Sequence, residues 1–201
     1  MLVTQISEVS KSRSRVYLDG QFAFVLYKGE LCQFQIKENQ ELSDESYQQI
    51  MTQILSKRAK LRSMNLLQSR DYTRKQLEDK LRQGGYPKEC IEEAIAYVES
   101  YGYIDDRRYA KDYIEYHIQT KSKTRIETDL LRKGIAKDVI REAYEELWSM
   151  GVEQDECAII RDLLQKKKYC ADTATEQERQ KMYGFLYRRG FSPEAIMREL
   201  S

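Results

Sequence analysis

The sequence predicts a mainly α-helical protein in which three tandem three-helix repeats follow a small N-terminal β element. Its 201 residues include 33% charged residues and only 2 prolines, a composition typical of water-soluble helical proteins. Residues 1–43 alternate apolar and polar side chains, whereas apolar residues recur at helical spacing in the rest of the chain. A pattern centred on a glycine also occurs three times, which indicates a repeat architecture.

The first 43 residues favour β-structure. The stretches "LVTQISEV" and "RVYLDGQFAFVLY" place β-branched and aromatic residues at alternating positions, which suits strands. Asp19-Gly20 lies inside the second stretch and is a strong hairpin-turn signal. We therefore expect two or three short antiparallel strands. The following "KGELCQFQIKENQELS" is ambiguous and fits a short helix followed by a loop.

The helical part of the chain begins at Asp44, with Ser43 as its N-cap. Apolar residues then follow at close to helical spacing as far as residue 68. This segment is the expected first helix of the first repeat.

Three glycines, Gly85, Gly134 and Gly190, align with one another together with their neighbours. A leucine lies four residues before each glycine and an isoleucine six residues after it: Leu81, Leu130, Leu186, Ile91, Ile140 and Ile196. Each glycine suits the end of a helix, where a positive φ is required. The apolar residue after the glycine and the later isoleucine form a hydrophobic staple that fixes the start of the next helix.

The expected helix starts differ in capping strength. Thr73 begins a capping box, and Ser192-Pro193 supplies a cap and a favourable first helical residue. Pro87 and Ala136 occupy the equivalent positions in the other two repeats, where they form weaker caps.

A repeat of about 50 residues accommodates three helices. The expected first helices span 44–68, 106–119 and 153–168, and the expected segments are the β element at 1–43 and repeats at 44–101, 102–149 and 150–201. Each unit buries little apolar surface alone, so we expect neighbours to pack into an elongated, curved, solenoid-like body. Such bodies bind long partners along a concave face.

The near-neutral net charge of +1 conceals a repeated polarity. Lys and Arg are concentrated around the middle helices, and Asp and Glu around the third helices: 55–83, 119–133 and 165–190 are basic, and 87–99 and 135–156 are acidic. Aligned basic helices would suit a phosphate backbone, and an acidic flank would suit a basic protein surface. The alternative is that these charges are solvated helix faces with internal salt bridges.

Several classes of protein are not indicated. No apolar run approaches the roughly 18 residues of a membrane span, and the N-terminus lacks a signal-peptide pattern, so we expect a cytoplasmic protein. Four scattered cysteines and one histidine offer no metal cluster, and we expect no cofactor. Asp105-Asp106 fits a helix N-terminus better than a metal or catalytic dyad, which makes an enzyme the least favoured class.

The segments "RDYTRKQLEDKLRQGGYPKECIEEAIAYVESYGYIDD", "GYIDDRRYAKDYI" and "DLLRKGIAKDVIREAYEEL" resemble the RecX family of bacterial recombination regulators. The resemblance covers residues 55–201, with a looser third unit, whereas residues 1–43 carry no recognised motif. It implies a non-enzymatic regulator that binds the filament of the RecA recombinase on DNA and mostly inhibits it. Such a protein would act in DNA repair, DNA recombination and the SOS response.

The family has no sharply defined catalytic residues to transfer, so the candidate binding residues come from the basic helices. They are Arg70, Arg74, Lys75, Lys80, Arg82, Lys123, Arg125, Arg132, Lys133, Arg188 and Arg189. The expected partners are RecA and single-stranded or double-stranded DNA, the latter bound weakly alone, by a monomer without membrane association. The alternative function is a stand-alone helical nucleic-acid-binding module.

Overall fold

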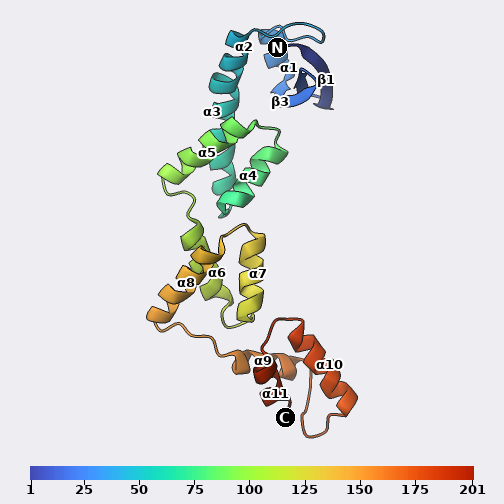
Figure 1. Cartoon of the computed structure of the whole chain (residues 1–201), viewed down its shortest axis with the longest axis vertical. Coiled ribbons are helices and arrows are strands. Elements are labelled where there is room, and N and C mark those ends of the chain that lie inside the picture. Colours follow the sequence, from blue (N-terminus) through green and yellow to red (C-terminus); the bar gives the residue numbers. More distant parts are fainter. The chain divides into compact units, whose positions relative to one another are not determined.

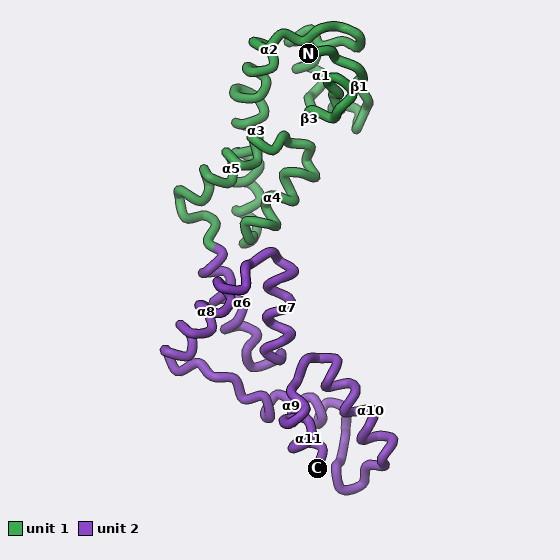
Figure 2. Tube along the Cα trace, in the orientation of Figure 1, with its two compact units in different colours: residues 1–105 green, residues 106–201 purple.

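The computed structural model describes residues 1–201, and most of them are helical (Figure 1). The chain divides into two compact units, residues 1–105 and 106–201 (Figure 2). A three-stranded antiparallel sheet precedes all the helices. The predicted class, mainly α with an N-terminal β element, is therefore confirmed, while the curvature of the expected body stays a prediction.

The N-terminal sheet is a meander in which each strand pairs with the next. Its strands are β1 (Val3–Ser10), β2 (Arg13–Leu18) and β3 (Gln21–Tyr27). Asp19 and Gly20 both have positive φ, 49° and 81°, as a tight hairpin turn requires. Helix α1 (Lys28–Gln33) follows directly, so the ambiguous segment does begin as a short helix.

The expected helix from residue 44 to 68 forms as one continuous run, in which α2 (Asp44–Gln49) and α3 (Ser56–Leu67) flank a π-helical segment, η1 (Ile50–Leu55). Ser43 caps the run and accepts a hydrogen bond from the Ser46 backbone amide at 3.1 Å. Bonds between residues five apart widen the π segment, and Ile50 and Leu55 are both buried there.

Three three-helix domains follow the predicted pattern. The first uses α3, α4 (Arg74–Gln83) and α5 (Lys88–Ser100); the second uses α6 (Asp106–His117), α7 (Lys123–Arg132) and α8 (Lys137–Ser149); the third uses α9 (Glu156–Lys166), α10 (Glu176–Tyr187) and α11 (Pro193–Leu200). The helices pack within each domain, with the first and third helices in contact in every case. The segment boundaries at residues 43, 101 and 149 stay predictions.

The glycine turns and caps agree with the sequence pattern. Gly85, Gly134 and Gly190 have φ of 79°, 89° and 83° after the middle helices. Thr73 forms the expected capping box at α4. Ser192 accepts a hydrogen bond from the Ala195 amide at the start of α11.

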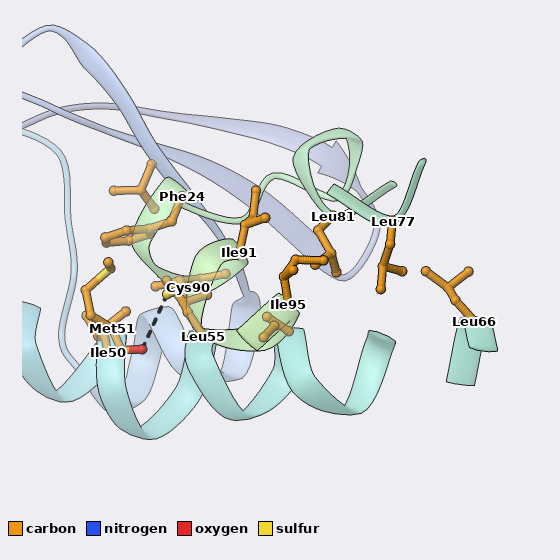
Figure 3. Close-up of a cluster of buried hydrophobic side chains, with 14 of the residues drawn as sticks. Phe24, Ile50, Met51, Leu55, Leu66, Leu77, Leu81, Cys90, Ile91 and Ile95 are labelled. Carbon is orange, nitrogen blue, oxygen red and sulfur yellow. Dashed lines mark hydrogen bonds between the residues drawn. The ribbon is translucent and has the colours of Figure 1, made fainter. Parts of the chain in front are cut away.

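The first unit has one hydrophobic core that joins the sheet to the first helical domain (Figure 3). Phe24 and Leu26 of β3 share this core with Ile50 and Leu55 of the long helix and Ile91 of α5, and all five are buried. The second unit contains two further cores, one in each of its domains. The β element is thus part of the packing of the first domain.

Replacing Gly85 with alanine tests the turn between α4 and α5. A Cβ at this position would collide with the Val25 side chain of β3, in addition to the strain of a positive φ. We expect Gly85→Ala to lower the free energy of unfolding by about 2–4 kcal/mol, because left-handed strain and overpacking add. Urea denaturation measures this change.

Gly102→Ala is the matched control, because Gly102 also has a positive φ, 68°, but faces open space. It should cost only about 1 kcal/mol, the strain alone. Equal losses in the two variants would show that Val25 does not restrict the turn.

Cys90 provides a second test of the first core. Its side chain is 2% exposed, and the thiol donates to the Met51 carbonyl oxygen at 3.6 Å (Figure 3). Burial, assisted by Glu93 and Glu89, raises the pKa of the thiol to about 11. Because only the thiolate reacts readily, we expect a thiol reagent at pH 8 to modify the exposed Cys32 and Cys170 in the native protein but Cys90 only in urea. Rapid native labelling of Cys90, located by mass spectrometry, would contradict this core.

Candidate nucleic-acid and partner interface

Most of the candidate cations in the first unit contact nearby acids. The Arg74 guanidinium donates to Glu99 at 2.6 Å and to Glu78 at 3.1 Å. Lys75 and Arg82 share the carboxylate of Asp79, at 2.8 and 3.0 Å. These ion pairs are partly exposed and contribute little to stability.

Arg70 and Lys80 are placed differently. The Arg70 guanidinium lies 4.5 Å from the ring centroid of Tyr72, a cation–π contact. Lys80 is exposed on α4. The structure therefore does not bring the first unit's candidates into one cluster.

Three candidates on or next to α7 lie against aromatic or acidic side chains. The Lys123 ammonium lies 4.6 Å from the ring centroid of Trp148, which is 47% exposed. Lys133 lies 5.3 Å from the ring of Tyr113. Arg132 is 4.0 Å from Asp129.

The remaining three candidates, Arg125, Arg188 and Arg189, meet in one cavity of about 380 Å³ inside the second unit. Lys121 joins them, and Ser122, Leu163 and Phe191 complete most of the wall. We call this cavity the interdomain pocket, because α7 of the second domain and the end of α10 in the third domain line it. It is the place where the structure gathers predicted site residues from two repeats.

Ser122 holds the two sides of the interdomain pocket together. Its hydroxyl donates to the Arg189 carbonyl oxygen at 2.6 Å and accepts from the Arg125 amide at 3.2 Å, so it also caps α7. Gly190 fits against this contact, since a Cβ there would lie 3.0 Å from both the Ser122 hydroxyl and Thr124. The backbone carrying Arg188 and Arg189 is thereby fixed beside the start of α7.

One acid partly balances the interdomain pocket. Asp129 accepts from Lys121 at 3.0 Å and lies 3.4 Å from Arg125. Burial acts to raise the pKa of Asp129, but the hydrogen bond and charge of Lys121 outweigh it and the pKa lies below its ordinary value. Asp129 therefore stays ionised at neutral pH, and its stabilising effect is lost only as the pH falls below the ordinary carboxylate range. Neither Arg188 nor Arg189 forms an ion pair with a carboxylate, in contrast to Arg125.

A second basic cavity, of about 440 Å³, lies in the third domain and shares Arg188 with the first. Lys167, Lys168 and Lys181 line it together with the ring of Phe185. The Lys167 ammonium and the Arg189 guanidinium lie 5.2 and 4.4 Å from that ring. Its one acid, Glu178, accepts from the Thr175 amide at 2.9 Å at the start of α10. We call this cavity the third-domain pocket.

Sequence reasoning missed four cations of these cavities: Lys121, Lys167, Lys168 and Lys181. The basic run from 165 to 190 contains three of them and was a usable signal. Lys121 belongs to the basic run from 119 to 133 but lies outside the middle helix, and the loop that leads into α7 places it here.

The acidic third helices contact the first helices of their own domains. Glu93 bonds Lys60 at 2.7 Å, and Glu146 bonds Lys111 at 2.6 Å. In the third domain Arg161 lies 3.5 Å from Glu199. Internal salt bridges, the alternative weighed for the charge pattern, therefore account for part of it.

The molecule shows neither a metal-binding cluster nor a membrane-spanning helix. No group of three or more His, Cys, Asp or Glu side chains is arranged to hold a metal ion. No helix has the length and apolar character needed to cross a membrane.

The fold and the basic cavities define a class of protein built from tandem three-helix domains. Family models described as the first, second and third three-helix domains of RecX match residues 59–97, 105–143 and 153–200. A "Regulatory protein RecX" from Caldanaerobacter subterraneus subsp. tengcongensis is 33% identical, over 100% of this chain and 99% of the relative. The chain belongs to the RecX family.

Other relatives and solved structures agree. A "Regulatory protein RecX" from Bacillus subtilis is 28% identical over 96% of this chain and 74% of its own. A structure described as "Crystal structure of regulatory protein RecX" matches with a TM-score of 0.63 and 25% identity, over 98% of both chains. RecX from Lactobacillus salivarius matches with a TM-score of 0.56 and 22% identity, over 72% of this chain and 96% of that one; it supports the fold alone.

Ser122→Ala tests the contact that builds the interdomain pocket. The substitution removes a helix cap and leaves the Arg189 carbonyl oxygen without its donor. We expect the free energy of unfolding to fall by about 2–3 kcal/mol, the sum of a lost cap and a lost buried hydrogen bond.

Ser43→Ala is the control, because Ser43 caps its helix in the same way but lies at an exposed site where its hydroxyl bonds only Ser46. Its loss should be about 1 kcal/mol. If both variants lose the same amount in urea denaturation, Ser122 does not join the two domains.

Proposed function

We propose that this protein binds the RecA–DNA filament and lowers recombinase activity, without catalysis of its own. Membership of the RecX family over the full length of the chain carries the proposal, since the family resemblance implies RecA as the partner. The relatives bear the name of a regulatory protein, in keeping with a binding function.

The interdomain and third-domain pockets support contact with the filament's DNA. Arg188 lines both, and six further cations line one or the other: Lys121, Arg125, Lys167, Lys168, Lys181 and Arg189. Cations held at fixed positions beside an aromatic ring suit a phosphate backbone with exposed bases. The acids beside the pockets, Asp129 and Glu178, already accept hydrogen bonds from Lys121 and from the Thr175 amide, so their charge is partly balanced.

The first test measures ATP hydrolysis by RecA on single-stranded DNA. Added at a several-fold excess over RecA, the protein should lower the hydrolysis rate. Arg188→Ala combined with Arg189→Ala should require roughly 30-fold more protein for the same inhibition, since each of the two lost phosphate contacts weakens binding by about 1 kcal/mol.

Lys137→Ala combined with Arg141→Ala is the control, because it removes the same charge from exposed positions of α8 outside both pockets. It should inhibit like the wild-type protein. No inhibition by the wild-type protein would end the proposal, and equal loss in both variants would remove the two pockets from it.

The second candidate is a stand-alone nucleic-acid-binding module, which the same pockets favour. It predicts strong binding to bare DNA at physiological salt, with affinity falling linearly in a log–log plot against salt concentration. Weak binding to bare DNA, together with inhibition of RecA, favours the filament regulator.

A further inference from the structure

The exposed face of the N-terminal sheet has an unusual composition. Along β2, exposed or half-exposed residues alternate with buried ones, so Arg13, Arg15 and Tyr17 share one face while Ser14, Val16 and Leu18 face the core. The residues opposite them on β1 are neutral: Ser7 pairs with Arg15 and Gln5 with Tyr17. The face therefore carries two arginines and no carboxylate on its central strand.

This face forms one wall of a groove of about 370 Å³, which we call the sheet groove. The other wall is the end of α4 and its glycine turn, with Arg82, Gln83, Gly84 and Gly85. Gly85 lies so close to Val25 of β3 that no side chain fits there. The groove is thus built by tight packing of the first helical domain on the sheet.

The sheet groove combines positive charge with aromatic surface. No acidic residue lines it, whereas Arg13, Arg15 and Arg82 do. Neither Arg13 nor Arg15 forms an ion pair, and Arg82 shares Asp79 with Lys75. Burial raises the pKa of the nearby Tyr86 phenol, while the charges of Arg58, Arg62 and Arg13 oppose that rise, which is a further sign of the positive field here.

The aromatic surface comes from Phe22 and Tyr17. Their rings meet edge to face, with centroids 5.9 Å apart and planes at 72°. Phe22 is 46% exposed, although a folded domain gains by burying such a ring. An exposed ring beside arginines is the arrangement on which an unpaired base stacks while its phosphates contact cations.

A neighbouring cavity of about 770 Å³ limits where phosphates fit. It shares Phe22 and Arg82 with the sheet groove but is also lined by Asp19, Glu78 and Glu89. Carboxylates there would repel a phosphate chain. Phosphates therefore fit beside the Phe22 ring only on the side of the sheet groove.

We propose that the sheet groove binds single-stranded nucleic acid, with Arg13 and Arg15 on the phosphates and Phe22 and Tyr17 stacked on bases. In a duplex the bases are stacked inside the helix, where Phe22 and Tyr17 could not stack on them. An acidic peptide would contact the arginines but would leave the aromatic rings unused. The wall of the groove on the sheet lies outside the three family-model matches, whereas the wall from Arg82 to Gly85 falls within the first of them, residues 59–97. The proposed role of the groove does not depend on RecA.

The test measures binding of a fluorescent oligo-dT by the full chain, without RecA, across a salt series. Arg13→Ala with Arg15→Ala should weaken binding several-fold at low salt and reduce the slope of log affinity against log salt by about 1.4, because two contacts to a single strand are lost. Phe22→Ala should weaken binding by about tenfold with little change of slope, the effect of one lost stacking contact.

Lys37→Ala with Lys57→Ala is the charge-matched control, since both lysines are exposed in the first unit outside the groove. It should bind oligo-dT more tightly than the Arg13/Arg15 variant does.

Wild-type affinity and slope in the Arg13/Arg15 and Phe22 variants overturn the proposal. So does better competition by poly-glutamate than by unlabelled oligo-dT, which would assign the groove to an acidic peptide. Loss of RecA inhibition alone, with oligo-dT binding intact, would bear on the proposed function and not on this groove.

Discussion

The close approach permitted by the glycine after a middle helix is the constraint on which the rest of the structure depends. Gly85 and Gly190 have φ of 79° and 83°, which ends α4 and α10 without the steric cost that a Cβ would bring. Each glycine also packs against the body that precedes its own domain: Val25 of the sheet for Gly85, and Thr124 of the second domain for Gly190. One turn therefore both ends a helix and packs its domain against the sheet or domain that precedes it in the same unit.

The same turns determine where unbalanced positive charge gathers. Arg82 lies just before Gly84 and Gly85 and comes to face Arg13 and Arg15 across the sheet groove. Arg188 and Arg189 lie just before Gly190 and come to face Lys121 and Arg125. Because the last turn of a helix favours cations on electrostatic grounds, a basic helix end docked on its neighbour creates a basic cavity. In this chain the repeat thus builds a basic cavity at a docking point within each unit.

Acidic residues of the third helices form ion pairs with cations of the first helices and so offset part of the positive charge. Lys60 with Glu93, Lys111 with Glu146, and Arg161 with Glu199 tie the first helix to the third in each domain. Such partly exposed pairs add little stability singly, but they neutralise first-helix cations that would otherwise extend the positive surface. Each basic cavity brings several cations together beside an aromatic ring.

Local features were determined by the sequence itself. The hairpin at Asp19-Gly20, the capping box at Thr73 and the glycine turns each depend on a few consecutive residues whose backbone preferences act at short range. The candidate site was only partly predictable: of eleven cations chosen from basic helices, three meet in the interdomain pocket, and Arg74, Lys75 and Arg82 bond acids nearby. Which charges meet depends on contacts between residues far apart in the chain, as when Ser122 bonds the Arg189 carbonyl oxygen, and only the tertiary packing fixes those distances.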